Sequence, residues 1–194
     1  MANTLCFISV LLQDQATVQH LFPDRTADHY DALELNEDQI MGSLIFRARN
    51  NASVYDEDII TEIRDVIANV KANVTALVDG VTLKYHDLCG RRHNVCVVTG
   101  ERLLAPQFDA MRSIGILTYP KWKIPTTGDI VDLSFALADS DAELKRVGVV
   151  RVTFKLRHDL KPQVFDWEEA FLGFMHTQEV NHSDLFFSAS RSTR

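Results

Sequence analysis

Two cysteines and two histidines lie close together in the middle of the chain. His86, Cys89, His93 and Cys96 form the pattern H-x2-C-x3-H-x2-C. Thiolates and imidazoles are the usual ligands of structural zinc, although the central spacing here is shorter than in most zinc fingers. Residues 90–95 between the cysteines form a polar run with the glycine and asparagine of a tight surface turn, which instead favours a disulfide across that turn. From these residues alone, both the disulfide and the zinc site remain open.

Three N-x-Ser/Thr sequons begin at Asn51, Asn73 and Asn181, whereas about one is expected by chance from this Ser/Thr content. We expect these asparagines to be glycosylation sites, which places the chain in the secretory pathway. The remaining cysteine, Cys6, is far from the other two and is expected to be unpaired. Three cysteines are too few to assign a redox compartment by number alone.

The composition indicates one globular domain, and the absence of catalytic motifs predicts that it is not an enzyme. The chain has 194 residues and a net charge of -7, which argues against nucleic acid or an anionic membrane as a bulk partner. The apolar run at residues 5–12 is too short to cross a bilayer, so the chain alone is expected to be soluble. The sequence lacks the G-x-S-x-G, phosphate-loop and H-E-x-x-H motifs, and we predict no catalytic residue, metal or cofactor.

Hydrophobic periodicity predicts the first two elements of the domain. Residues 42–49 alternate between apolar and polar side chains, as in a half-buried strand. Ser53 with Asp56 then opens a helix whose apolar residues repeat at helical spacing as far as Leu77. The pair Asp79-Gly80 is expected to end that helix.

The second half of the chain predicts a strand pair, a helix and a last strand. Residues 131–137 and 150–156 both alternate and are expected to pair in antiparallel fashion. Pro162 is expected to end that segment, and Asp166 with Glu169 to open the second helix. Residues 185–189 form the fourth strand.

The resulting order is β-α-β-β-α-β, which predicts an α+β fold of the ferredoxin-like kind, a four-stranded sheet with helices on one face. We assign residues 42–190 to this domain, 1–41 to an N-terminal segment and 191–194 to a tail. Residues 80–128 are a long insertion between the first helix and the second strand. The insertion holds Cys89 and Cys96 and a predicted helix at 103–113.

Basic side chains gather on the predicted open face of the sheet, and we expect them to bind a partner: Arg47, Arg49, Arg151, Lys155 and Arg157. Binding of RNA on such a face also requires aromatic side chains for base stacking. Phe46 and Phe154 alternate onto the opposite face, so we predict that nucleic acid does not bind there. Docking against an acidic protein domain fits this face better.

Six segments occur along the chain in an order shared with a known family: Phe22-Pro23 with residues 24–29, residues 42–54, Tyr85-His86-Asp87-Leu88-Cys89, Cys96, Leu117-Thr118-Tyr119-Pro120 and residues 187–192. They resemble the first extracytoplasmic domain of Patched-related proteins, members of the resistance-nodulation-division transporter superfamily. One departure is Arg91-Arg92-His93, where relatives commonly carry an aromatic residue. The resemblance covers most of the chain.

This resemblance implies that Cys89 and Cys96 form the paired cysteines of the family, and it does not extend to the flanking histidines. It also implies a parent membrane protein, with a transmembrane helix before this domain and a sterol-sensing membrane region and a second extracytoplasmic domain after it. The expected role is non-enzymatic participation in sterol or lipid transport, or in Hedgehog-type signal reception, on the extracellular or lumenal side. The alternative is a free-standing cytosolic α+β module that binds zinc or nucleic acid.

Overall fold

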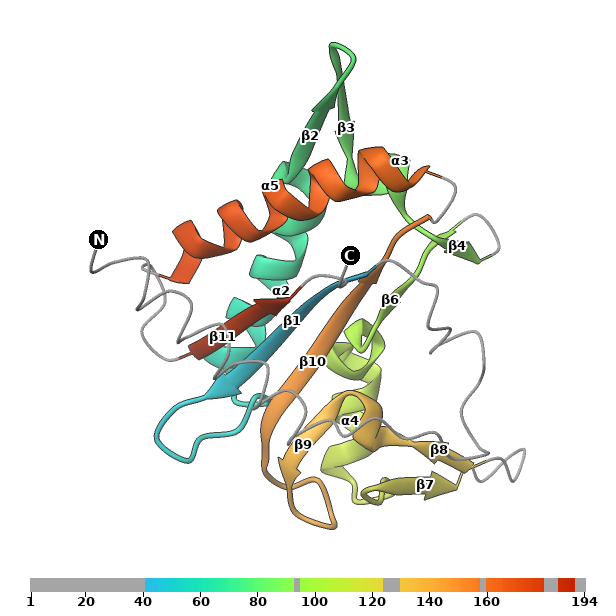
Figure 1. Ribbon diagram of the computed structural model, residues 1–194. Coiled ribbons are helices and arrows are strands. Elements are labelled where there is room, and N and C mark those ends of the chain that lie inside the picture. The colour runs from blue at the N-terminus through green and yellow to red at the C-terminus, as the bar shows by residue number, and fades with distance from the viewer. Residues whose placement is uncertain (1–40, 93–94, 124–129, 158–159, 180–184, 191–194) are drawn as a thin grey trace.

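The computed structural model describes residues 41–92, 95–123, 130–157, 160–179 and 185–190 (Figure 1). Within them the chain is a mixed α/β structure with four α-helices and several antiparallel sheets. The main sheet has the order β11-β1-β10-β6, and β9 pairs with β10 as well. The predicted segment 1–41, except Met41, and the predicted tail 191–194 lie outside the described residues.

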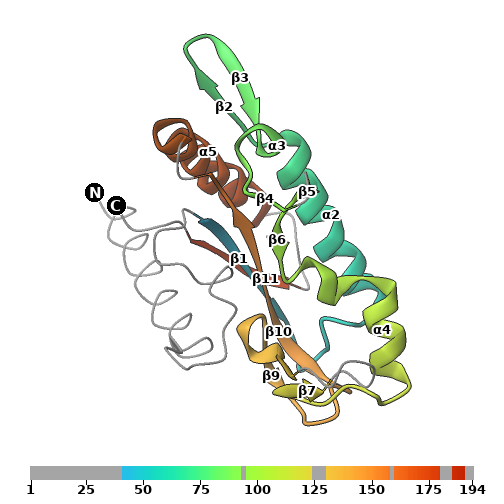
Figure 2. The same ribbon diagram turned by 90° about the vertical axis from the view of Figure 1, so that its right-hand side faces the viewer.

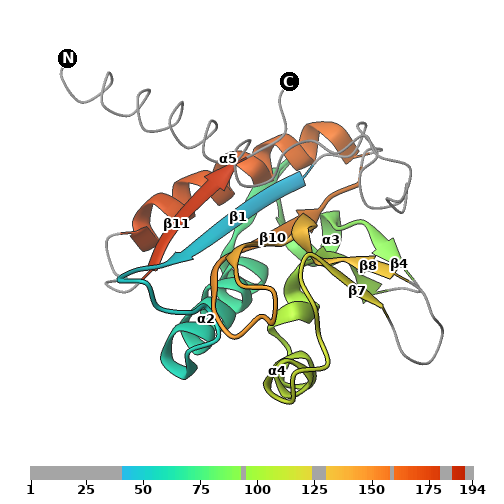
Figure 3. The same ribbon diagram turned by 90° about the horizontal axis from the view of Figure 1, so that it is seen from below.

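The central strands β1 (Met41–Ala48) and β10 (Val147–Lys155) confirm two strands that the alternation predicted. They pair in antiparallel fashion with Leu44 opposite Val152, and β1 also pairs with β11 (Leu185–Ser190). Figure 3 shows these three strands side by side. Alternate residues, including Leu44 and Val152, point into the main core, where they are fully buried.

Helix α2 (Glu57–Asn73) confirms the first predicted helix but ends earlier than predicted. Its core-facing side is apolar, and Figure 2 shows α2 and α4 on the same side of the central strands. Val74 leaves the helix, and β2 (Thr75–Val78) turns back into β3 (Val81–Lys84). The pair Asp79-Gly80 therefore forms a hairpin turn instead of a helix stop. Both residues have positive φ, at 50° and 79°, as a two-residue Asp-Gly hairpin requires.

The predicted insertion does not stand apart from the sheet. After α3 (Tyr85–Leu88), β4 (Arg91–Arg92) pairs with β5 (Val95–Cys96), and β6 (Val98–Thr99) then joins β10 as an edge strand. The chain just after β6 approaches β10 so closely that position 100 requires glycine, because a Cβ there would lie 2.2 Å from the Arg151 carbonyl oxygen. The helix predicted at 103–113 is present as a 3-10 turn (Glu101–Leu104) followed by α4 (Pro106–Ser113).

The prediction of a single strand at residues 131–137 is wrong. The chain forms β8 (Ile130–Asp132), a 3-10 turn (Leu133–Phe135) and β9 (Leu137–Ser140) instead. The Asp132 carboxylate accepts a hydrogen bond from the Ser134 NH at 3.0 Å, and this local bond competes with strand pairing. As a result β8 pairs with β7 (Lys121–Lys123), and only β9 pairs with β10.

Helix α5 (Lys161–Glu179) begins five residues before the predicted capping pair. Pro162 lies in its first turn, where a missing NH costs nothing, so proline opens this helix and does not end the segment before it. Asp166 and Glu169 are inside the helix and do not cap it. The buried face of α5 carries Trp167 and Phe171, which pack against the sheet. Among the described residues, no helix is long and apolar enough to span a membrane.

Candidate functional site

Cys89 and Cys96 form a disulfide, with their Cα atoms 5.5 Å apart. Cys89 is fully buried, whereas Cys96 is half-buried on β5. The pairing of Arg91 with Cys96 makes the segment between the cysteines a hairpin, as the polar turn predicted. We call residues 89–97 the clasp.

The clasp is attached to the end of β10 by backbone hydrogen bonds. The Gly90 NH donates to the Lys155 carbonyl at 2.9 Å, and the Lys155 NH donates to the Val97 carbonyl at 3.3 Å. Next to these bonds, the Arg157 NH beyond β10 donates to the carbonyl of Leu88, just before the clasp, at 2.8 Å. The disulfide therefore fixes an element that extends the main sheet.

The side chain of Tyr85 contacts both the clasp and β10. Its hydroxyl lies 2.9 Å from the Val97 carbonyl and 3.3 Å from the Lys155 carbonyl. Burial raises the pKa of this hydroxyl above its usual range, so the group stays protonated and can donate. Its ring packs against Phe154 and Trp167, with centroid distances of 5.3 and 5.6 Å. Neither periodicity nor motif predicted this role of Tyr85.

The disulfide uses both sulfurs of the zinc pattern, so neither is present as a free thiolate ligand. His86 is exposed beside Asp87, with a nitrogen-to-oxygen distance of 3.1 Å, and His93 lies outside the described residues. In the part of the chain that the structure describes, no cluster of three or more His, Cys, Asp or Glu side chains is placed to hold a metal ion.

The predicted basic residues are not equally accessible. Arg47 and Arg157 are exposed, Arg49 and Arg151 are half-buried, and Lys155 is only 7% exposed. By strand register Arg47, Arg151 and Lys155 do share the predicted face. That face also carries a small buried apolar cluster of Ile45, Ala138 and Val149. It is therefore a mixed surface on which Arg47 is the most exposed of the three cations in register, whereas Arg157 is exposed beyond the end of β10.

Two of the three sequons lie on the surface. Asn51 is exposed in the turn after β1, and Asn73 is exposed at the last residue of α2. Asn181 lies outside the described residues. Ser53 of the first sequon, however, is buried and accepts a hydrogen bond from the Val147 NH at 3.2 Å. Modification at Asn51 would therefore have to precede folding of this turn.

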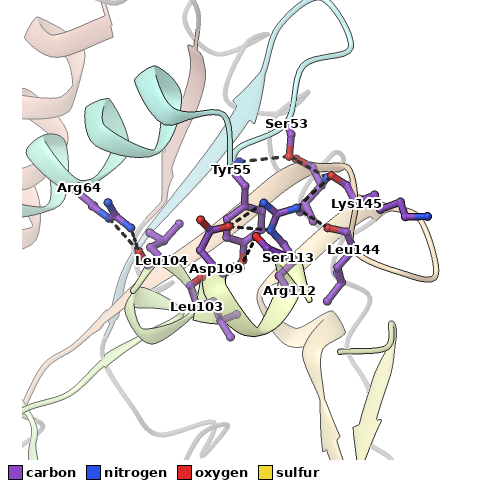
Figure 4. A network of polar contacts seen from close by, with 11 residues as sticks. Ser53, Tyr55, Arg64, Leu103, Leu104, Asp109, Arg112, Ser113, Leu144 and Lys145 are labelled. Carbon is purple, nitrogen blue, oxygen red and sulfur yellow. Dashed lines mark hydrogen bonds and ion pairs between the residues drawn. The ribbon is translucent and has the colours of Figure 1, made fainter. Parts of the chain in front are cut away.

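A polar network that the sequence did not predict joins α4 to the start of α2 (Figure 4). The Arg112 guanidinium donates to the Asp109 carboxylate at 2.7 Å and to the Leu144 carbonyl at 3.1 Å. It also lies 4.6 Å from the centroid of the Tyr55 ring, and the Tyr55 hydroxyl donates to the Leu103 carbonyl at 2.9 Å. Burial raises the pKa of Tyr55 above its usual range. The network connects segments distant in sequence and serves as a structural joint.

The loop between β9 and β10 is organised by two carboxylates. Asp141 accepts backbone hydrogen bonds from Glu143, Lys145 and Arg146 at 2.9 to 3.1 Å. Partial desolvation opposes the effect, but these donors together lower the pKa of Asp141 below its usual 3.8. Hydrogen bonds from Arg146, which lies 3.0 Å from the Asp139 carboxylate, lower the pKa of Asp139.

We predict that this loop makes the fold sensitive to acid. Because the folded pKa of Asp141 is lower than the unfolded one, its stabilisation is present above about pH 4 and is lost as pH falls through the folded value. Asp141→Asn should lower the free energy of unfolding by about 1 kcal/mol at pH 7 and weaken its fall between pH 7 and pH 3. Urea denaturation at both pH values measures this. Asp65→Asn, an exposed change on α2, is the control, and an unaltered pH dependence in Asp141→Asn would refute the prediction.

Two open cavities flank the segment after the clasp. One of about 680 Å³ lies beside β6 and is lined by residues 95–103 with Val131 and Phe135. The other, about 420 Å³, lies between α2 and the 3-10 turn at Glu101–Leu104, and Arg64 and Lys71 line it. Lys71 is paired with Glu101 at 2.5 Å, and Arg64 donates to the Leu104 carbonyl at 2.9 Å. These basic groups are thus engaged within the chain.

In comparisons with known proteins, no family model and no curated protein matches this chain.

Proposed function

We propose that the chain is a non-enzymatic extracytoplasmic domain of a Patched-like membrane protein. In this proposal the parent takes part in sterol or lipid transport, or in Hedgehog-type signal reception, and the domain faces the extracellular or lumenal side. The observation that carries the proposal is the disulfide between Cys89 and Cys96, which joins two of the segments that resemble the family. Persistent disulfides are typical of oxidising compartments, and the exposed Asn51 and Asn73 sequons are compatible with one.

We further propose that the domain is ferredoxin-like. The neighbours β11-β1-β10, with β9 beside β10 and every pair antiparallel, support this, because they are the neighbours expected for a β-α-β-β-α-β chain. In this scheme β6 and the clasp are additions at the edge of the common sheet.

The first test is the sequence of the transcript on both sides of this segment. The proposal expects a membrane-spanning segment before it, and a sterol-sensing membrane region and a second extracytoplasmic domain after it. A complete transcript without any membrane-spanning segment would contradict it.

The second domain is the expected partner of the basic face. Charge reversal at the two exposed cations, Arg47→Glu with Arg157→Glu, should weaken association with that domain by about tenfold at low salt and less at high salt. Arg102→Glu, an exposed arginine on the 3-10 turn, is the matched control. Surface plasmon resonance at two ionic strengths measures the effect, and affinity equal to that of the Arg102→Glu control would refute the docking role.

A further inference from the structure

The open face of the main sheet is buried, although none of the described helices covers it. Its apolar residues, Ile45, Ala138 and Val149, form a cluster of their own and are at most 7% exposed. Every other buried apolar residue of the described chain belongs to the main core, on the side of the sheet where α2 and α4 lie (Figure 2). Ser43 and Thr153 are also buried on the open face, and their hydroxyl oxygens lie 3.1 Å apart. Some other part of the molecule therefore covers this face.

The burial of the cations on the open face increases toward one end of the sheet. Along the register, Arg47 is exposed, Arg151 is half-buried and Lys155 is only 7% exposed. A lysine on a bare sheet surface keeps its ammonium group in water, so the burial of Lys155 indicates that other atoms pack over it. Lys155 is paired with Met41, the first residue of β1. The covered end is therefore the end at which the chain enters the sheet.

The segment that enters the sheet at this end is residues 1–40. The exposed fractions are those of a single copy of the chain, so the covering atoms belong to the chain itself. Of the stretches outside the described residues, 1–40 is the longest, and each of the others has at most six residues. An extended chain spans about 3.3 to 3.6 Å per residue, so residues 31–40 alone are long enough to follow the eight-residue strand β1.

The composition of this segment complements the open face. Residues 1–40 contain seven Asp or Glu residues, one Arg and no Lys, so they carry most of the net charge of -7. The last ten of them combine four carboxylates with two leucines: Asp31, Leu33, Glu34, Leu35, Glu37 and Asp38. A buried ammonium group requires a polar or charged partner, and the apolar cluster requires an apolar one. Residues 31–40 supply both.

We propose that residues 31–40 bind in the same chain along the open face of the sheet, with their carboxylates at the Lys155 end. Glu37 and Asp38 precede Met41 by three or four residues, which is within about 15 Å of extended chain, so they can reach the Lys155 ammonium group. An acidic partner can then reach the centre of the face only by displacing this segment. The segment is thus an intramolecular competitor of such partners. This inference concerns the chain alone and does not depend on the identity of the parent protein.

Zero-length crosslinking of the unaltered chain tests the contact. A carbodiimide joins a lysine amine to a carboxylate only where the two groups touch, and mass spectrometry of the digested monomer identifies the joined pairs. We expect Lys155 to be joined to Glu34, Glu37 or Asp38, with a yield that does not depend on protein concentration. The exposed Lys121 of β7 is the internal control and should not be joined to these residues.

Neutralising the segment provides a second measurement. In a variant with Glu34→Gln, Glu37→Gln and Asp38→Asn, acetic anhydride should acetylate Lys155 about tenfold faster, because the segment no longer holds its position over the ammonium group. The matched control neutralises three exposed carboxylates on α2 and α5: Asp58→Asn, Asp65→Asn and Glu169→Gln. This control should leave the acetylation rate of Lys155 unchanged.

The inference would be overturned if Lys155 gave no crosslink to residues 31–40, or gave such crosslinks only between two copies of the chain. Equal acetylation of Lys155 in the two triple variants would overturn it as well. Association of the second domain through Arg47 and Arg157 is measured separately, so these results leave the proposed function untouched.

Discussion

Replacing Trp167 with alanine is expected to lower the free energy of unfolding by about 3 to 5 kcal/mol, the largest effect of any single change considered. Trp167 is completely buried on α5 and stacks on Phe171, with ring centroids 5.3 Å apart. It also contacts Tyr85, which binds the clasp, and donates its NH to the end of α2. One side chain thus connects the sheet, both long helices and the disulfide segment.

Chemical denaturation measures this loss, and two further variants separate its causes. Trp167→Phe keeps an aromatic ring but removes the hydrogen bond to the Val74 carbonyl, so it should cost less than Trp167→Ala. Trp122→Ala, at the half-buried tryptophan of β7, should also cost less. Equal losses for Trp167→Ala and Trp122→Ala would show that Trp167 is not the centre of the core.

Removing the disulfide is the second large change. Replacing Cys89 and Cys96 together with alanine should lower the free energy of unfolding by about 2 to 2.5 kcal/mol, because the unfolded chain regains the entropy of a short closed loop. The effect should be local: the amides of Gly90 and Val97 should exchange faster with solvent, since both belong to the clasp.

Amides of β1, which is hydrogen-bonded on both sides, serve as the internal reference for that exchange experiment. Reduction of the unaltered protein should reproduce the stability of the double alanine variant. A variant as stable as the oxidised protein would contradict the role of the clasp as a fixed extension of the sheet.

The sequence was sufficient to predict the strands and helices whose hydrophobic periodicity is regular. β1, β10 and the first four turns of α2 follow their alternating or helical patterns closely. The same reasoning failed after Asn73 because Val74 and Leu77 continue the helical spacing of Val70 by coincidence. The stronger signal was the Asp79-Gly80 turn between apolar residues, which is typical of a hairpin.

The sequence indicated the turn between the two cysteines but not the position of the clasp against β10. The polar run between Cys89 and Cys96 indicated a turn, but its attachment depends on Lys155, which is about sixty positions away in sequence. The Arg112 network also joins distant segments, to Leu144 and to the Tyr55 ring. No local pattern encodes such contacts, because they arise only when the sheet brings the segments together.

We expect this to be a disulfide-bearing domain of an oxidising compartment, and counting thiols in protein from its own cells tests this claim. Cells are lysed in denaturant that contains an alkylating reagent, and the cysteine-containing peptides of this chain are identified by mass spectrometry, with and without prior reduction. Of the three cysteines, only Cys6 should be alkylated without reductant, and all three after it. Three alkylated thiols without reductant, or stoichiometric zinc in the native protein, would contradict the claim.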